Sequence, residues 1–598
     1  MTTKKAVVEL QGLISPDSAS AWISNLWTQW DQARANKVAE WSEVEKYVFA
    51  TDTTTTSNKT LPWTHSTTIP KLTQIRDNLH SNYISSLFPN DKWLTWVAHD
   101  EEAAKKETAE TLQAYMENKT REGGFRDVIS QLVYDYIDYG NCFAMPSFEA
   151  RYKEVDNERV TSFIGPRGVR ISPYDIVFNP VATSFEESPK IVRTMQTLGG
   201  LKKLAQSDPA QQFWIDALER RQEIHAAAVS YSREDWAKAS QYQVDGFGSL
   251  QEYYSSDAVE VLEFYGDFHD SETGELRENR MITIVDRSWV VRDVPIPSYG
   301  GEALIRHAGW RKRPDNIWAM GPLDNLVGMQ YLLDHYLNMG ANALDLKVMP
   351  PKKIFGEVEQ FDWEPNAEIH IDAEGDVQEM AQQFGDVMTV RDFLQELEYR
   401  MEMYAGAPRE AMGIRTPGEK TAFEVQSLEN AAGRIFQEKV TQFELFMEKL
   451  LNDMLEVAHK NLTYTDLIRV VDKDVGAQRF KEVTKEDITA KGILRPIGAR
   501  HFAQRAQELQ NIVGIFNSPL GQMVMPHTST KQLSKFVEDV VNLRGYDIFR
   551  DNVAIEEQQE AQSLMQQAEE DNIMASQLSQ EEMASTGGIG TRPEEGAL

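Results

Sequence analysis

The chain has 598 residues and a net charge of −32, with 41% hydrophobic residues, 26% charged residues and a single cysteine. This length predicts two to four structural regions, and one cysteine excludes a disulfide framework and a Cys-based zinc site. We expect no signal peptide, and no stretch approaches the roughly 20 apolar residues of a membrane span. The sequence shows no Lys/Arg cluster of the kind that holds duplex DNA by neutralising phosphates.

The N-terminal half alternates blocks of helices with blocks of strands. Apolar residues recur at helical spacing over 17–50, 72–88 and 101–137, and the polar, threonine-rich stretch 51–60 interrupts them. Extended runs joined by turn-prone residues follow over 141–197 and 258–307. This separation predicts an α+β fold that is mainly helical overall. We expect Cys142 to fill a small space in the core.

Long helices dominate the chain after Met320. A helix is expected up to Pro350-Pro351, because proline lacks the amide and disfavours helix in the residue before it. A short insert with strands near 352–358 and 367–372 follows. The other expected elements are a helix over 387–406, a helix of about 60 Å over 420–459, strands within 464–495, helices over 495–516, 529–542 and 551–582, and a disordered tail over 584–598.

The stretch "GIRTPGEKT" (413–421) is one residue away from a phosphate-binding loop. Glu419 separates the second glycine from Lys420, which would place a carboxylate beside the phosphates. A working loop also needs a β-strand upstream, whereas "LQELEYRMEMYAG" has the pattern of a helix. We interpret the stretch as a flexible loop between two helices and not as an ATP site.

No other pattern points to catalysis. The eleven histidines are scattered without the H-x-x-x-H or H-E-x-x-H spacing of a helical zinc site, and no G-x-S-x-G elbow occurs. We therefore expect no enzymatic activity and no metal or other cofactor.

Five stretches in order resemble the portal proteins of tailed bacteriophages, and short-tailed phages in particular. They are "PWTHSTTIPKLTQIRDNLHSNYISSLFP", "RISPYDIVFNP", "HAGWRKRPDNIWAMGPLDNLVGMQYLLDH", "DLKVMPPKKIFGEVE" and "PGEKTAFEV". The resemblance covers roughly residues 60–520. It implies a fold of wing, stem, clip and crown regions: wing at 1–320, stem helices at 321–347 and 387–404, clip at 348–386, tunnel loop at 405–419, wing helix and strands at 420–495, crown at 496–582 and a disordered tail at 583–598.

The resemblance also implies a function and a set of partners. Portal proteins form dodecameric rings at one capsid vertex, where the terminase large subunit packages double-stranded DNA through the channel without sequence specificity. Tail adaptor or head-completion proteins dock later, and the ring also meets major capsid and scaffolding proteins. The expected location is the virion, with the host cytoplasm during assembly and no membrane. The alternatives are an ATP-driven translocase with a degenerate loop and a long-helix scaffold protein.

Site residues follow from this plan. On the loop, Arg409 and Arg415 would contact phosphate or pair with neighbouring carboxylates. On the stem, ion pairs between subunits with Arg391 and Arg400 compete with exposure of the carboxylates to the channel. We expect Phe355 and Trp363 to fill a core between clips. The candidates are Arg409, Glu410, Met412, Ile414, Arg415 and Lys420 for the tunnel loop; Asp334, Asp345, Asp392, Glu396 and Glu402 for the stem channel; and Lys352, Lys353, Glu357 and Glu359 for clip docking.

Overall fold

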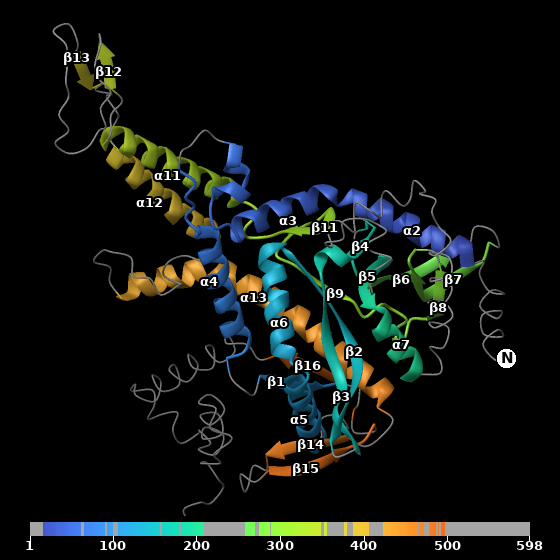
Figure 1. Cartoon of the computed structure of the whole chain (residues 1–598). Coiled ribbons are helices and arrows are strands. Elements are labelled where there is room, and N and C mark those ends of the chain that lie inside the picture. The colour runs from blue at the N-terminus through green and yellow to red at the C-terminus, as the bar shows by residue number, and fades with distance from the viewer. Residues whose placement is uncertain are drawn as a thin grey trace, which may run out of the picture. The chain divides into compact units, whose positions relative to one another are not determined.

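The structure is a computed structural model, and its contacts divide the chain into two compact units. The first contains residues 1–468 and 482–499, and the second contains 469–481 and 500–598. The residues that the structure describes are 16–60, 65–89, 93–99, 106–155, 158–179, 181–182, 184–207, 258–269, 274–287, 289–348, 352–355, 376–379, 387–405, 422–462, 466–471, 478–485, 488 and 492–496. Helices and strands form separate layers in the first unit, so the fold is α+β (Figure 1).

The first unit contains helices together with a three-stranded and a five-stranded sheet. The helices are α2 (Pro16–Ala33), α3 (Ala35–Val48), α4 (Lys71–Leu87), α5 (Lys106–Glu122), α6 (Phe125–Asp138), α7 (Leu198–Ser207), α11 (Val327–Val348), α12 (Val387–Tyr404) and α13 (Ala422–Asn461), with the 3-10 turns η1 (Thr53–Thr55), η2 (Ser57–Thr60) and η3 (Pro173–Asp175). The α11–α12 pair projects away from both sheets (Figure 1). Three expected helices are divided or shortened. The stretch 17–50 breaks at Arg34, 101–137 breaks at Gly123-Gly124, and α11 begins at Val327 instead of residue 321.

The five-stranded sheet is an antiparallel layer in the order β4-β5-β6-β7-β8. Its two faces are both buried. Ile23 and Trp27 of α2 pack against Leu262 and Ile282 on one face, and Trp41 of α3 belongs to the cluster on the other face. The strands are β4 (Ile176–Phe178), β5 (Lys190–Thr197), β6 (Ala258–His269), β7 (Leu276–Val285) and β8 (Trp289–Pro295).

The three-stranded sheet has the order β3-β2-β9, and helices α6 and α13 pack on it (Figure 1). Cys142 is fully buried in β2, as expected. A fork of hydrogen bonds from Arg306 of β9 to Asp453 of α13, at 2.6 and 2.9 Å, joins the sheet to the long helix. The strands of the three-stranded sheet are β2 (Asn141–Val155), β3 (Glu158–Ile171) and β9 (Arg306–Gly309). The remaining strands form two-stranded sheets: β1 (Leu94–Ala98) with β16 (Gly492–Pro496), β10 (Arg311–Arg313) with β11 (Asn316–Met320), β12 (Lys352–Phe355) with β13 (Asp376–Glu379), and β14 (Asp466–Val471) with β15 (Gln478–Val483).

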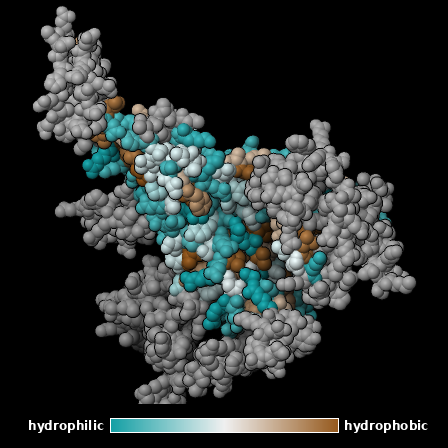
Figure 2. Space-filling model, in the orientation of Figure 1, coloured by the Kyte–Doolittle hydropathy of each residue, from teal (hydrophilic) through white to brown (hydrophobic). Residues whose placement is uncertain are grey.

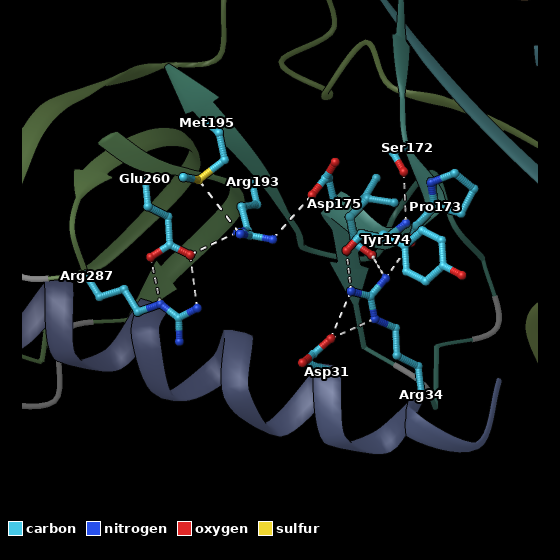
Figure 3. Close-up of polar contacts among 11 residues, drawn as sticks. Asp31, Arg34, Ser172, Pro173, Tyr174, Asp175, Arg193, Met195, Glu260 and Arg287 are labelled. Carbon is cyan, nitrogen blue, oxygen red and sulfur yellow. Dashed lines mark hydrogen bonds and ion pairs between the residues drawn. The ribbon is translucent and has the colours of Figure 1, made fainter. Parts of the chain in front are cut away.

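A buried network of arginines and carboxylates holds α2 and the five-stranded sheet together (Figure 3). Glu260 of β6 is fully buried and accepts hydrogen bonds from Arg193 and Arg287, each at 3.0 Å. Arg287 lies in the turn between β7 and β8, in the left-handed region with φ of 58°. At the end of α2, Arg34 bonds Asp31 and three backbone carbonyls of residues 173–176. The guanidinium of Arg34 thus ties the junction of α2 and α3 to η3 and β4.

Candidate functional site

The α11–α12 pair is the part of the chain that corresponds to the expected stem. The two helices are antiparallel neighbours, because successive contacts run in opposite directions along them. The ring of Tyr336 lies edge-on to that of Phe393, with 5.0 Å between the ring centroids, and Gly340 lies against Val390. Strands β12 and β13 lie at the far end of the pair (Figure 1). They pair antiparallel, with Lys352 opposite Glu379 and Phe355 opposite Asp376. The bounds of α12 agree with the prediction of 387–404.

The α11–α12 pair exposes an unusual amount of hydrophobic surface. Of the sixteen large hydrophobic side chains exposed in the described part of the chain, nine lie on these two helices, with exposed fractions of 37–77%. Hydrophobic surface shows along the pair in the view of Figure 2. Hydrophobic side chains exposed singly are ordinary on a protein surface, but here nine of them are concentrated on two neighbouring helices. The nine residues are Leu332, Met339, Leu344, Leu346, Val348, Phe393, Tyr399, Met403 and Tyr404.

Residues 65–70 together with Lys71, the first residue of α4, connect the body of the first unit to α11, and we call this stretch the anchoring segment. Three polar side chains of α11, spaced by four residues, bond its main chain. Gln330 donates to the carbonyl of Ile69 at 2.7 Å, and Asn338 both accepts from the amide of Thr67 and donates to its carbonyl. Asp334 accepts from the amide of Ile69 at 3.2 Å. These bonds replace the partners that the main chain of the segment would find in a sheet.

The same segment also holds α12. Lys71, at the end of the anchoring segment, donates to Glu402 at 2.6 Å and lies 3.7 Å from Glu398. Lys71 and Glu402 are almost completely buried, with side-chain exposures of 5% and 2%. A charge pair in such a place gains strongly from Coulomb attraction but also needs both partners, since either charge alone would lose its hydration without compensation. Bonds from Thr67, Thr68, Ile69 and Lys71 therefore hold the base of both helices.

Asp334 is a buried carboxyl group that is held by hydrogen bonds. It accepts from Thr68, Ile69 and Gln330, and no ion pair to it occurs among the described residues. Burial raises the pKa of Asp334 to about 6, while the bonds from Thr68, Ile69 and Gln330 act in the opposite direction. Desolvation dominates because hydrogen bonds replace only part of the lost hydration.

This pKa makes the stability of the protein depend on pH. The folded-state pKa lies above the ordinary value of 3.8, so the folded chain binds the proton more tightly than the unfolded chain. The stabilisation is present below pH 4 and is lost as the pH rises towards 6. We expect D334N, which removes the charge, to gain roughly 3 kcal/mol relative to wild type between pH 4 and pH 7 in urea unfolding.

The matched control is D392N, which removes an exposed carboxylate from α12. Its stability relative to wild type is expected to change by less than about 0.5 kcal/mol over the same range. If the two variants behave alike, the pH dependence does not come from Asp334.

The five stem carboxylates that the sequence suggested fall into two groups. Asp345, Asp392 and Glu396 are exposed; Asp345 bonds His65 at 2.6 Å and Glu396 bonds Arg400 at 2.8 Å. Asp334 and Glu402 are buried, at 0% and 2% exposure, and are engaged by the anchoring segment. Their assignment to a channel wall was wrong, because their oxygens already serve contacts inside the subunit.

The other predicted site residues are described only in part. Lys352 and Lys353 lie on β12, and the expected strand at 352–358 is confirmed over Lys352–Phe355. Phe355 is 40% exposed in the single chain. Trp363, Glu357, Glu359 and the second expected clip strand lie outside the described residues, as do the predicted crown and tail and the tunnel-loop residues Arg409, Glu410, Met412, Ile414, Arg415 and Lys420.

Sequence reasoning missed two features. The first is the polar ladder of α11, whose buried positions are Gln330, Leu333, Asp334 and Asn338. Polar residues at i, i+4 and i+8 were the available signal. The second is the run Arg311–Arg313, three exposed cations on β10, which contradicts the statement that the chain has no basic cluster.

Comparisons with known proteins leave the family unassigned. No protein-family model and no curated protein matches the chain. Among the described residues, no group of three His, Cys, Asp or Glu side chains is placed to hold a metal ion. No helix in that part of the chain combines the length and the apolar character needed to cross a membrane.

Proposed function

We propose that this chain is the subunit of a phage portal ring, through which double-stranded DNA is packaged into a capsid and later ejected. The observation that supports it is the hydrophobic surface of the α11–α12 pair. Nine exposed hydrophobic side chains on two neighbouring helices favour burial against further copies. The resemblance of five sequence stretches to portal proteins supplies the family.

A closed ring gives such a surface a partner without a second kind of chain. In a head-to-tail interface, one face of each copy covers a different face of the next, and rotation closes the ring. The proposal is a dodecamer in which the helix pairs surround the channel. The exposed acids Asp345, Asp392 and Glu396 would then give the wall a negative character, which keeps phosphates from binding tightly as DNA slides.

In this proposal the chain has no catalytic role. The energy for packaging comes from the terminase, which docks on the clip around β12 and β13, and a tail adaptor replaces it afterwards. Capsid and scaffolding proteins hold the ring at one vertex of the virion.

Electron microscopy of the purified protein, with particle mass measured in parallel, tests the proposal. We expect rings of about twelve copies with an axial hole wide enough for duplex DNA. Open filaments, or a small oligomer without a hole, would contradict it.

A pair of leucine variants tests the surface that carries the proposal. L344E places a charge on the exposed hydrophobic surface of α11, and L276E does the same at a comparably exposed leucine of β7. Burying a lone charge is unfavourable, so L344E should raise the concentration needed for assembly at least tenfold, or about 1.4 kcal/mol per interface. L276E should assemble as wild type does. Equal behaviour of the two variants would show that the α11 surface is not an interface.

A further inference from the structure

A basic hairpin stands out on this acidic chain. Arg311, Lys312 and Arg313 form β10, and all three are exposed. Strand β10 pairs antiparallel with β11 to form the hairpin, with Arg311 opposite Met320 and Arg313 opposite Asn316. The residues opposite the two arginines are therefore uncharged. An irregularity in the register lies between the two arginines. Three adjacent cations thus lie on one short strand in a chain with a net charge of −32.

A fourth cation joins them from a distant part of the sequence. Lys439 of α13 lies 5.4 Å from the centre of the Trp310 ring, and the guanidinium of Arg311 lies 5.3 Å from the same ring. Trp310 is buried and donates its indole N–H to Tyr83 at 3.2 Å, so this platform is rigid. Burial lowers the pKa of Lys439, the neighbouring Glu438 raises it, and Arg311 and Lys312 lower it further. Lys439 therefore lies close enough to Arg311 and Lys312 for their charges to repel it.

The arginines of the hairpin differ from the other arginines nearby. Three of those arginines each donate two hydrogen bonds to one aspartate: Arg76, Arg170 and Arg306. Across the described ranges, by contrast, no carboxylate forms an ion pair with Arg311, Lys312 or Arg313. The acids closest in sequence or contact are Asp315 at the hairpin turn and Glu438, which is 3.8 Å from Lys439. The hairpin therefore keeps excess positive charge that an external anion could neutralise.

We propose that Arg311, Lys312 and Arg313, with Lys439 beside them, form a contact site for the phosphate backbone of double-stranded DNA. Its chemistry requires a polyanion, because exposed cations on a strand offer several separate contacts to a row of negative charges. The choice of DNA over another polyanion rests on the proposed function. The contact carries no sequence information, since it involves only the backbone.

The small number of cations predicts a weak and rapidly exchanging contact. Each neutralised phosphate contributes about −0.9 to the slope of log K against log salt, so three to four contacts give a slope of about −3. Proteins with 6–10 phosphate contacts depend on salt far more steeply. A site of this size holds DNA for short times and lets it move on.

The test is a titration of a fluorescently labelled duplex of about 20 base pairs with the full-length protein, read by anisotropy between about 50 and 200 mM salt. The variant is R311Q/K312Q/R313Q. The control is K46Q/R151Q/K449Q, which removes the same total charge at exposed positions on α3, β2 and α13. We expect the hairpin variant to bind at least tenfold more weakly at low salt, and its slope of log K against log salt to become shallower by about 2.7. The affinity and the slope of the control variant should stay near those of wild type. R313Q alone should reduce the slope by about 0.9, which tests the site with a minimal change to the fold.

Several results would overturn the proposal. These are no binding by wild type, equal loss in both triple variants, or an unchanged slope in the hairpin variant. A hairpin variant that loses self-association and keeps DNA binding would assign the cations to an interface between copies instead. Microscopy of the same samples separates this test from the proposed function, because a protein that forms no ring contradicts the portal proposal while the titration still decides the role of the hairpin.

Discussion

The substitution E260Q is expected to lower the free energy of unfolding by about 3–5 kcal/mol. Glu260 is fully buried between Arg193 and Arg287, whose side chains are 4% and 5% exposed. Glutamine keeps the shape but removes the charge, so both buried guanidinium groups lose a buried anionic partner, although Arg193 keeps the partly exposed Asp175 at 3.5 Å. Urea unfolding followed by circular dichroism measures the loss. The loss should be accompanied by weaker packing of β6 against β5 and β7, because each arginine comes from a neighbouring strand or turn.

The chain contains a close match for the control. Glu149 also accepts hydrogen bonds from two arginines, Arg151 and Arg167, at 2.9–3.1 Å. Its side chain is 36% exposed, so water replaces the lost contacts. E149Q should cost less than about 1 kcal/mol. A similar cost for the two variants would mean that burial does not set the strength of the Glu260 network.

The elements that were predicted well are those with a strong local pattern. The helix expected at 387–406 is α12, Val387–Tyr404, and the helix expected at 420–459 is α13, Ala422–Asn461, with Gly433 inside it. Apolar residues at helical spacing mark both, and the pattern lies within the segment itself. Proline also marked where α11 ends, whereas the division of 101–137 into α5 and α6 at Gly123-Gly124 was not predicted.

The attachments between elements could not be predicted in the same way. The polar side chains Gln330, Asp334 and Asn338 of α11 bond residues 67–69, more than 250 positions earlier in the chain. No pattern within α11 predicts a partner that lies so far away in the sequence. A stripe containing Gln330, Asp334 and Asn338 resembles a solvated face when the helix is considered alone. For the same reason Asp334 and Glu402 were assigned to a channel, although both face the anchoring segment. The basic run at Arg311–Arg313 was visible, but its fourth member, Lys439, is added only by the fold.

The anchoring segment has a mechanical consequence for any assembly built on the α11–α12 pair. Residues 67–69 bond α11, and Lys71 bonds α12, so a force that moves either helix acts on the same seven residues. Displacing one helix would require breaking a buried charge pair or a set of main-chain bonds. We infer that the base of the helix pair is rigid relative to α4, whereas towards its far end the anchoring segment contributes only the exposed contact between His65 and Asp345.

The second large effect is therefore expected at Lys71. K71M removes the cation that lies 2.6 Å from Glu402, inside a site where both side chains are almost completely buried. We expect a loss of about 3–5 kcal/mol in the free energy of unfolding, measured in urea. Hydrogen exchange should rise at the C-terminal end of α12 and at the start of α4, where the pair joins the two helices. The control is K46Q, which removes a half-exposed lysine paired with Glu43 and should cost less than about 1 kcal/mol.

The double variant K71M/E402L separates the loss of a bond from the cost of a buried charge. With both charges gone, two apolar side chains of similar length can pack in the same place, and such replacements are often neutral or stabilising. We expect the double variant to recover most of the stability that K71M loses, and to restore slow hydrogen exchange at the end of α12. If the double variant is less stable than K71M, Glu402 holds α12 through its other contacts, and Lys71 is not the residue that fixes the base of the pair.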